Sequence, residues 1–316
     1  MKIALISDVH GNYPALHAVL ADAAERAVDF YVFAGDYIFD NPFPNEVVHR
    51  LRRMENAAVI QGNKEGYLTG MEREDKTAWK FDQLAAMYWT YRALSEENRR
   101  WLMRLPQQAY IPLGNGERLY TVHFMEKLEG RMAKTDCSSS RYAARMKSHP
   151  FTHEVFLQEM EQSVGARQDL QWLPELGASV IVTGHTHLQW YFRYGDVLWI
   201  NPGSCGQPLD FNPLAPYSIV HIDGRDKSVE ERRVPYDVEA VSLAHRSSGM
   251  RAAAPVWTTL IEKSLYGAED VFSPMFAAAA DIASRKGEGG SPYSNETWNE
   301  AARTLGVIQE KADYDG

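Results

Sequence analysis

The chain has 316 residues, of which 45% are hydrophobic and 24% are charged, and its formal net charge is −9. This composition is ordinary for a globular protein with a buried core, and no apolar run approaches the roughly 18 residues that a membrane span needs. The acidic balance also argues against a general nucleic-acid-binding protein, because such proteins hold phosphate mainly with clustered Lys and Arg.

The N-terminal segment goes directly into a predicted core strand. Its apolar run is too short for a signal peptide, so we expect a cytoplasmic protein. The two cysteines, Cys137 and Cys205, are far apart in sequence and do not have a metal-type spacing. A disulfide framework or a thiolate zinc site therefore has little support.

The first part of the chain alternates short strands with amphipathic helices. The strand KIALISD is followed by a helix over about residues 13–27 and then by the strand DFYVFAGD. A second helix, with Val47, Val48 and Leu51 on one face, leads to the strand AAVIQGN. These β-α-β steps predict parallel strands joined by right-handed crossovers.

The strand signal disappears from about 66 to 105, where Trp, Tyr, Leu and Ala at helical spacing predict two helices. The segment AYIPLGNGERLYTVHF then predicts a β-hairpin with its turn at Asn115-Gly116, and its second strand delivers His123 at its end. Residues 127–175 are expected to be helical or irregular. We expect the insertions at about 66–108 and 127–175 to overhang the site and to select the substrate.

The remainder of the chain is rich in predicted hairpins and then changes composition. The segments SVIVTGHTH, LQWYFRYGDVLWINPGS and PYSIVHIDGRDKSVEERRVPY predict strands joined by Gly-Asp and Asp-Gly turns. After about residue 241 Ala, Ser, Met and Gly dominate, and RKGEGGSPYS at 285–294 predicts a flexible segment before a last helix. We expect a main domain over 1–241 and a partly flexible helical extension over 242–316, which could cap the sheet, dimerise or reach over the site.

Potential metal ligands stand at the ends of the predicted strands. They are Asp8 and His10 after the first strand, Asp36 after the second, Asn63 after the third, His123 after the hairpin, and His185 and His187 after SVIVTG. The carboxyl ends of strands in open α/β sheets are where ligand sites form. Residues two apart in an extended segment point to the same side, so the two residues of Asp-x-His and of His-x-His can act together.

These ligand types indicate a pair of divalent metal ions. Oxygen donors and imidazoles without thiolates suit Mn²⁺ first, with Fe²⁺, Zn²⁺ or Ni²⁺ as alternatives. Seven ligands exceed what one ion needs, whereas two ions that share a bridging carboxylate account for the number. Each motif alone also arises by chance, and the prediction depends on their combination.

Glycines are expected to let the backbone approach the ions at positions 11, 35, 62 and 184. The other histidines are expected to be structural or solvated, most clearly His17, His49, His221 and His245.

The motifs together resemble a known family. SDVHGN at 7–12, GD at 35–36, GN at 62–63, His123, GHTH at 184–187 and NPGS at 201–204 are similar to those of the calcineurin-like metallophosphoesterase superfamily. PNEVV, NPGSCGQP and VPYDVEAV narrow the resemblance to its bacterial and archaeal phosphodiesterase-like branch, over about residues 1–241. The resemblance implies an α/β fold, a four-layer α/β/β/α sandwich of two mixed sheets with the dimetal centre at their top. Helical insertions and the C-terminal helical extension would be added to it.

The resemblance also implies which residue does what. By motif position, Asp8, His10 and His187 would hold the first ion, and Asn63, His123 and His185 would hold the second. Asp36 would bridge the two ions. Family members usually carry a second Asp shortly after Gly-Asp, and a His followed by an acidic residue after Gly-Asn. In this chain Asp40 lies one position late, Lys64 replaces the histidine, and Glu65 keeps the acidic position.

Lys64 raises the question of whether the chain is an enzyme. A lysine can stabilise phosphoryl charge, and it can donate a proton only if its pKa falls from about 10.4, which two nearby dications would favour. We predict that Lys64 clamps the phosphate; the alternative is that it points to solvent or pairs with Glu65. The superfamily also includes the scaffold subunit of the retromer coat, which lacks that histidine, so a non-catalytic metal-binding scaffold or sensor is the alternative function.

The complete ligand set favours a metal-dependent phosphoesterase in which hydroxide bridging the two ions attacks phosphorus in line. Phosphodiesters are the first choice of substrate and phosphomonoesters the second. The substrate is expected to be a small phosphorylated molecule, a nucleotide or another phosphoester, and a homo-oligomer is possible. Asp36, Asn63 and Lys64 are the catalytic candidates. Substrate contacts are expected from Asn12, Lys64 and Arg131, although Arg131 with Lys127 and Lys134 could equally be a solvated basic face.

Overall fold

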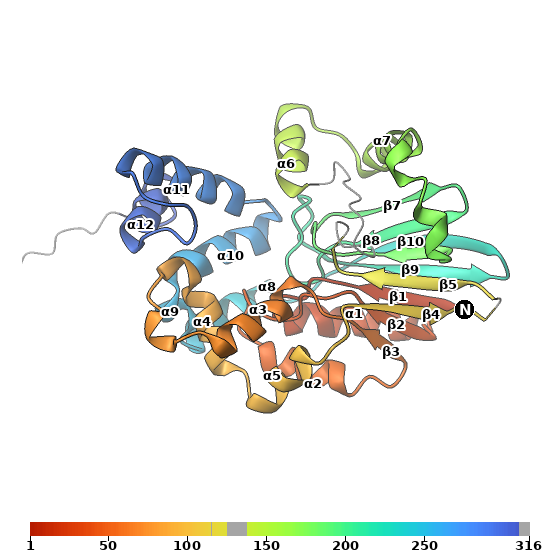
Figure 1. Ribbon diagram of the computed structural model, residues 1–316, viewed down its shortest axis with the longest axis horizontal. Coiled ribbons are helices and arrows are strands. Elements are labelled where there is room, and N and C mark those ends of the chain that lie inside the picture. The colour runs from red at the N-terminus through yellow and green to blue at the C-terminus, as the bar shows by residue number, and fades with distance from the viewer. Residues whose placement is uncertain (115, 125–137, 310–316) are drawn as a thin grey trace, which may run out of the picture.

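Two mixed five-stranded sheets form the centre of the computed structural model, which describes residues 1–114, 116–124 and 138–309 (Figure 1). The first sheet has the order β10-β9-β1-β2-β3. Its strands are β1 (Lys2–Ile6), β2 (Phe30–Phe33), β3 (Ala57–Val59), β9 (Ala215–Asp223) and β10 (Asp226–Val234). The strands β1, β2 and β3 run parallel, as the β-α-β steps predict, and β9 runs antiparallel beside β1.

The second sheet has the order β4-β5-β6-β8-β7. Its strands are β4 (Gln108–Pro112), β5 (Arg118–Val122), β6 (Val180–Val182), β7 (Gln189–Tyr194) and β8 (Val197–Pro202). The predicted hairpin is confirmed, because β4 and β5 pair antiparallel with Tyr110 opposite Tyr120. The strands β5, β6 and β8 are parallel, so their carboxyl ends share one edge.

The period-two alternation of the strands builds the core. Ile3 and Leu5 of β1 pack with Val180 and Val182 of β6 in the layer between the two sheets. Ala4 and Ile6, on the opposite face of β1, pack in the cluster that includes the helices covering the first sheet. Each fully buried aliphatic side chain of this kind contributes about 1.5–3 kcal/mol by leaving water.

Helices cover both outer faces of the sheets. The first sheet is covered by α1 (Tyr13–Glu25) and α2 (Pro44–Arg52), and the second by α6 (Ser139–Ser148) and α7 (His153–Gly165). Short 3₁₀ turns follow α7 at Gln168–Leu170 and Leu173–Leu176. The layers therefore run helix, sheet, sheet, helix, which confirms the predicted four-layer α/β/β/α sandwich.

The prediction of two helices between 66 and 105 is wrong. The structure has three, α3 (Asn63–Arg73), α4 (Ala85–Ala93) and α5 (Glu96–Met103), with 3₁₀ turns at Lys76–Ala78 and Asp82–Leu84. Leu94 and Ser95 are extended, and the Ser95 side chain accepts a hydrogen bond from the Asn98 N–H, so a cap divides α4 from α5.

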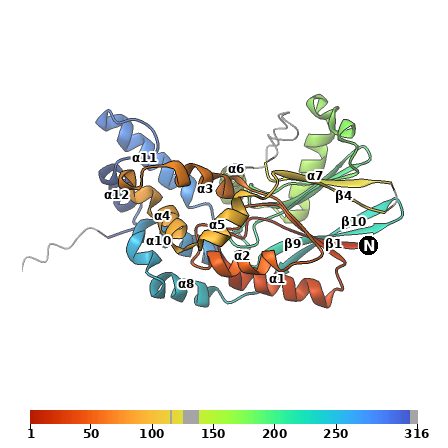
Figure 2. The same cartoon turned by 60° about the horizontal axis from the view of Figure 1, so that its bottom comes forward.

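The C-terminal extension is helical throughout most of its described length. It consists of α8 (Val238–Ser247), which begins before the predicted start at residue 242, and of α9 (Met250–Ala253), α10 (Pro255–Gly267), α11 (Phe272–Lys286) and α12 (Asn295–Thr304). Met250 and Ala254 pack against Ala86 of α4, so the extension lies beside the inserted helices at one end of the sheets (Figures 1 and 2). None of the helices in the described part of the chain combines the length and apolarity of a transmembrane segment.

Candidate metal centre

The loops that follow β1, β2, β3, β5 and β6 bring the predicted ligands to one edge of the two sheets. Two groups form there, and within each group the ligand atoms lie within 4.8 Å of one another. The groups are Asp8, His10 and His187, and Asp36, His123 and His185. Residues that are far apart in sequence thus share a site, as the positions of the strand ends predict.

The first group surrounds a carboxylate oxygen that has no hydrogen-bond partner in the described part of the chain. His10 Nε2 and His187 Nε2 lie 3.1 Å apart, and both face Asp8 Oδ1, at 3.7 Å and 3.4 Å. Asp8 Oδ1 is buried and has no hydrogen-bond partner among the described residues. Because buried polar atoms are nearly always satisfied, this carboxylate oxygen and the two facing imidazoles fit a bound cation.

Asp36 joins the two groups. Its Oδ2 lies 3.3 Å from His123 Nε2 and 4.0 Å from His10 Nε2. Asn63, which the metal-ligand groups do not include, comes close through its side chain, because Asn63 Oδ1 lies 3.1 Å from His123 Nε2. The carboxylate of Asp36 therefore lies within 4.0 Å of a histidine from each group.

The outer ring nitrogens of the histidines are held by acceptors. His10 Nδ1 lies 2.7 Å from Asp40 Oδ2, His123 Nδ1 lies 2.6 Å from the Ala34 carbonyl oxygen, and His187 Nδ1 lies 2.7 Å from the Gln207 carbonyl oxygen. Hydrogen bonds of this kind turn the other nitrogen of each ring towards the centre of the site. Histidines that bind metals typically have such support.

The backbone is strained at the candidate ligands. Residues other than glycine rarely adopt a left-handed conformation, which is retained where the surrounding structure fixes it. Here φ is positive at Asp8 (53°), His10 (49°), Asp36 (57°), His185 (72°) and His187 (58°). This concentration of strain marks the same edge of the sheets as a functional site.

Two of the glycines near the site are needed for close packing. A Cβ on Gly62 would lie 2.1 Å from Asp36 Oδ1, and one on Gly184 would lie 2.6 Å from Asp8 Oδ2. The glycines were expected to let the backbone approach the ions. In the structure they let one loop pack against the ligand carboxylates of another.

The charges of the site compensate one another. Burial raises the pKa of Asp8, but His123, His10 and His187 outweigh it and hold that pKa well below its usual value. Burial lowers the pKa of His123, but Asp36 and Asp8 raise it to about 10. Carboxylates thus retain protons on His10 and His123, whereas burial and the nearby His123 lower the pKa of His185 to about 3. Cations would take the place of the retained protons, because metal binding needs neutral histidines.

Lys64 lies at the site. Its Nζ is 3.3 Å from Asp40 Oδ2, and its backbone N–H donates to Asp36 Oδ1 at 2.9 Å. The alternative that Lys64 pairs with Glu65 is wrong, because the Glu65 carboxylate accepts hydrogen bonds from the backbone N–H groups of Gly62, Asp36 and Tyr37. Burial lowers the pKa of Lys64, but Asp40 and Asp36 outweigh it, so the pKa is raised and Lys64 is a cation.

Asn12, a predicted substrate-binding residue, has another role in the structure. Asn12 is fully buried and caps α1: its Oδ1 accepts from the Ala15 N–H at 3.2 Å, and its Nδ2 donates to the Gly206 carbonyl oxygen at 2.9 Å. Both ends of the amide are used within the protein, so its contacts are structural rather than substrate-facing. Arg131, with Lys127 and Lys134, lies outside the described residues.

The C-terminal extension contributes residues that the sequence did not indicate. A hollow over both ligand groups is lined by His10 and His187 of the first, by Asp36 and His185 of the second and by Lys64. Trp257 of α10 and Phe272 of α11 also line it. The Trp257 Nε1–H donates a hydrogen bond to Asp40 Oδ1 at 2.9 Å. Of the three roles considered for the extension, the structure shows that it reaches over the site.

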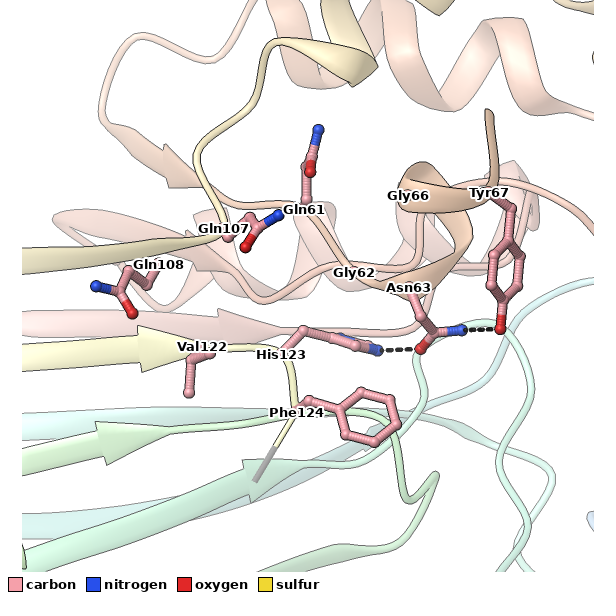
Figure 3. Close-up of a pocket in the computed structure, with 10 residues that line it drawn as sticks. All are labelled: Gln61, Gly62, Asn63, Gly66, Tyr67, Gln107, Gln108, Val122, His123 and Phe124. Atoms are coloured by element: carbon pink, nitrogen blue, oxygen red, sulfur yellow. Dashed lines mark hydrogen bonds between the residues drawn. The ribbon is translucent and has the colours of Figure 1, made fainter. Parts of the chain in front are cut away.

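A second cavity, of about 230 Å³, opens beside Asn63 and His123 (Figure 3). The side chains that line it come from the loop after β3, from α3, and from the ends of β4 and β5. They include Gln61, Tyr67, Gln107, Gln108 and Phe124, and none of the lining residues that the structure describes is Lys, Arg, Asp or Glu. The side-chain amide of Asn63 donates a hydrogen bond through Nδ2 to Tyr67 Oη at 3.3 Å, and its Oδ1 faces His123 (Figure 3).

Comparisons with known proteins agree with this geometry. A family model described as the calcineurin-like phosphoesterase superfamily domain matches residues 1–225. An uncharacterized protein of Methanocaldococcus jannaschii is 27% identical over 252 residues, which cover 75% of this chain and 88% of that protein. The crystal structure of a metallophosphoesterase from Sphaerobacter thermophilus has a TM-score of 0.58 at 24% identity, covering 84% of this chain and 99% of that one. A hypothetical protein of Pyrococcus horikoshii has a TM-score of 0.58 at 17% identity, covering 81% and 97%. Both structures share the fold.

Proposed function

Because the chain belongs to the calcineurin-like phosphoesterase superfamily, we propose that it hydrolyses small phosphoesters with the help of two divalent metal ions, and phosphodiesters in preference to phosphomonoesters. The observation that carries this proposal is the pair of ligand groups that Asp36 joins. Two such groups around one carboxylate are the arrangement that two-metal displacement at phosphorus requires.

The residues divide between the two ions according to their contacts. Asp8, His10 and His187 would hold one ion, Asn63, His123 and His185 the other, and Asp36 both. Mn²⁺ is the first choice for these mixed oxygen and imidazole donors, with Fe²⁺, Zn²⁺ or Ni²⁺ as alternatives. When bound, ions of this kind supply a nucleophile by lowering the pKa of water and offset the negative charge of the phosphoryl group.

Lys64 supplies a further positive charge to the phosphoryl group. Its side chain is partly exposed and lines the hollow over the two ligand groups, and Asp40 holds its ammonium there. A fixed cation that faces developing negative charge stabilises the transition state without reorganisation. We assign to Lys64 the binding of a phosphoryl oxygen.

The two hollows support a diester as substrate. One lies beside Lys64 and Trp257, and the other lies beside Asn63 and His123. A phosphodiester has two ester groups that can each enter one hollow, whereas a monoester has only one. Among the described residues, the lining of the hollow beside Asn63 contains no Lys, Arg, Asp or Glu, which favours an uncharged ester group there.

The alternative function is a metal-binding scaffold or sensor of the same fold. Three histidines with fixed outer nitrogens and a strained ligand backbone are features of a metal site, which a metal-binding scaffold would share with an enzyme. Hydrolysis of an ester by the metal-loaded protein distinguishes the two functions.

The deciding experiment measures hydrolysis of bis-p-nitrophenyl phosphate and p-nitrophenyl phosphate by metal-stripped protein, before and after addition of Mn²⁺, with Asp36→Asn as the control. We expect Mn²⁺ to restore activity in the wild type and not in Asp36→Asn, with faster turnover of the diester. Wild-type protein that binds two Mn²⁺ ions and hydrolyses neither ester nor any other phosphoester tested would favour the scaffold.

A further inference from the structure

The C-terminal extension is connected to His10 by a chain of two hydrogen bonds. Trp257 of α10 lies outside the residues that the family model matches, and its Nε1–H donates to Asp40 Oδ1 at 2.9 Å. The other oxygen of that carboxylate, Oδ2, lies 2.7 Å from His10 Nδ1. The orientation of the indole is thus transmitted through Asp40 to the imidazole of a candidate metal ligand.

Asp40 depends on this indole for one of its two oxygens. The residue is 3% exposed, so the protein has to supply its hydrogen-bond donors. His10 and Lys64 both approach Oδ2, whereas Trp257 is the donor that the described structure gives to Oδ1. Without the indole N–H a buried carboxylate oxygen would lose its partner, and the carboxylate could turn to find another.

A second contact joins the extension to the same loop. His245 Nε2 of α8 lies 3.0 Å from Asn41 Oδ1. The same side-chain amide donates a hydrogen bond through Nδ2 to the His10 carbonyl oxygen at 2.9 Å. One helix of the extension therefore reaches the side chain of His10 through Asp40, and another reaches its backbone through Asn41. His10 has a left-handed backbone, which needs such support from its surroundings.

The indole itself is fixed by an aromatic cluster within the extension. The Trp257 ring lies 5.1 Å from that of Phe272 and 6.3 Å from that of Trp298, measured between ring centroids. Trp298 is fully buried, and its indole nitrogen has no hydrogen-bond partner in the described part of the chain. Two tryptophans thus share one cluster, and only Trp257 is bonded to the site.

We propose that the C-terminal extension completes the metal centre, with Trp257 as a positioning residue that orients His10 through Asp40. This inference rests on the proposed dimetal function, because His10 needs a fixed orientation in order to hold an ion. It identifies a part of the active site that lies outside the matched family domain.

The test compares Trp257→Phe with Trp298→Phe in the full-length chain. Both variants keep a ring in the aromatic cluster, and only the first removes a hydrogen bond to Asp40. Calorimetric titration of metal-stripped protein with Mn²⁺ gives the two affinities, and thermal unfolding without metal gives the stability. Asp40→Asn and the double variant Asp40→Asn with Trp257→Phe complete a double-mutant cycle.

Partners behind metal-binding histidines typically change affinity about 10-fold to 100-fold. We expect the lower end from Trp257→Phe, a loss of about tenfold at one of the two Mn²⁺ sites, and a much smaller loss when Asp40 is already Asn. Trp298→Phe should change thermal stability and leave both affinities as they are. Unchanged affinities in Trp257→Phe, an equal loss in both tryptophan variants, or an undiminished loss in the Asp40→Asn background would each overturn the proposal. These readouts need no turnover, so they remain informative if the protein proves not to be a phosphoesterase.

Discussion

The ammonium of Lys64 lies 3.3 Å from the carboxylate oxygen Oδ2 of Asp40. His10 Nδ1 lies 2.7 Å from the same oxygen. One buried carboxylate therefore holds both a candidate metal ligand and a cation that lines the hollow. A histidine in place of Lys64 would have a shorter side chain and would carry its charge only when protonated. The lysine of this chain therefore supplies a permanent charge at a position where the family usually has a titrating one.

Replacement of Lys64 by alanine should remove charge stabilisation without removing a metal ligand. Loss of one donor to a developing oxyanion typically costs about 10²-fold to 10³-fold in kcat. For Lys64→Ala we expect a fall of about 100-fold in kcat/KM on bis-p-nitrophenyl phosphate, with two Mn²⁺ ions still bound per chain. The exposed Lys263→Ala is the matched control. Unchanged kcat and KM on every ester that the protein hydrolyses would contradict this role.

Replacement of Glu65 should destabilise the site before any metal is bound. The buried carboxylate accepts hydrogen bonds from Gly62 N–H (2.7 Å), Tyr37 N–H (2.8 Å) and Asp36 N–H (3.0 Å). Each buried N–H left without a partner costs about 1–3 kcal/mol. We therefore expect Glu65→Ala to lower the free energy of unfolding of metal-free protein in urea by about 3 kcal/mol or more. The exposed Glu97→Ala serves as control, and a Glu65→Ala protein as stable as Glu97→Ala would contradict the expectation.

The candidate ligands could be predicted from the sequence because each follows a strand whose apolar run is plain. His10 and His187 are 177 positions apart in sequence, and they meet at 3.1 Å because their strands end at the same edge. The fold followed from the same β-α-β steps. Asn12 shows how a motif can mislead: its position suggested a substrate contact, but Asn before Tyr13-Pro14 is also a helix N-cap signature, and that is how the chain uses it.

Trp257 could not be predicted in the same way. Its helical spacing is that of an ordinary core residue, and nothing in the sequence shows which acceptor an indole N–H will reach. Trp257 lies on α10, well after the last strand β10, so the rule of strand ends does not apply to it. The predicted number of helices between 66 and 105 was wrong for a related reason. The break at Leu94-Ser95 depends on one capping side chain within a continuous helical pattern.

Burial of His245 should make the stability of the protein depend on pH. Burial and the nearby Arg251 lower the pKa of His245 from its ordinary value of 6.5 to about 4. The unfolded chain therefore binds a proton between pH 6.5 and 4 that the folded protein does not bind. The contribution to stability is complete above pH 6.5 and decreases as the pH falls, by about 2 kcal/mol at pH 5.

The variant His245→Gln should lose this dependence. We expect the difference in free energy of unfolding between wild type and His245→Gln to narrow by about 2 kcal/mol from pH 7 to pH 5, measured with urea on metal-free protein. The exposed His17→Gln accounts for the loss of an imidazole in general. A constant difference between wild type and His245→Gln over this range would show that His245 does not titrate below its ordinary pKa on folding.

The cavity beside Asn63 should distinguish esters by the charge of their second group. Gln107 lines this cavity with an amide side chain that is exposed and makes no hydrogen bond to the described residues, so it is free to contact a substrate (Figure 3). We expect p-nitrophenyl phenyl phosphate, whose second group is neutral and aromatic, to have a higher kcat/KM than p-nitrophenyl phosphorylcholine, whose second group is cationic.

The variant Gln107→Glu places a carboxylate in the cavity. An attraction of about 1 kcal/mol for the choline group would shift the ratio of the two kcat/KM values about fivefold towards the choline ester. Gln168→Glu makes the same change of charge away from the cavity and should leave the ratio unaltered. An identical ratio in Gln107→Glu and Gln168→Glu would mean that the second ester group does not enter this cavity, and the preference for diesters would then lose its structural support.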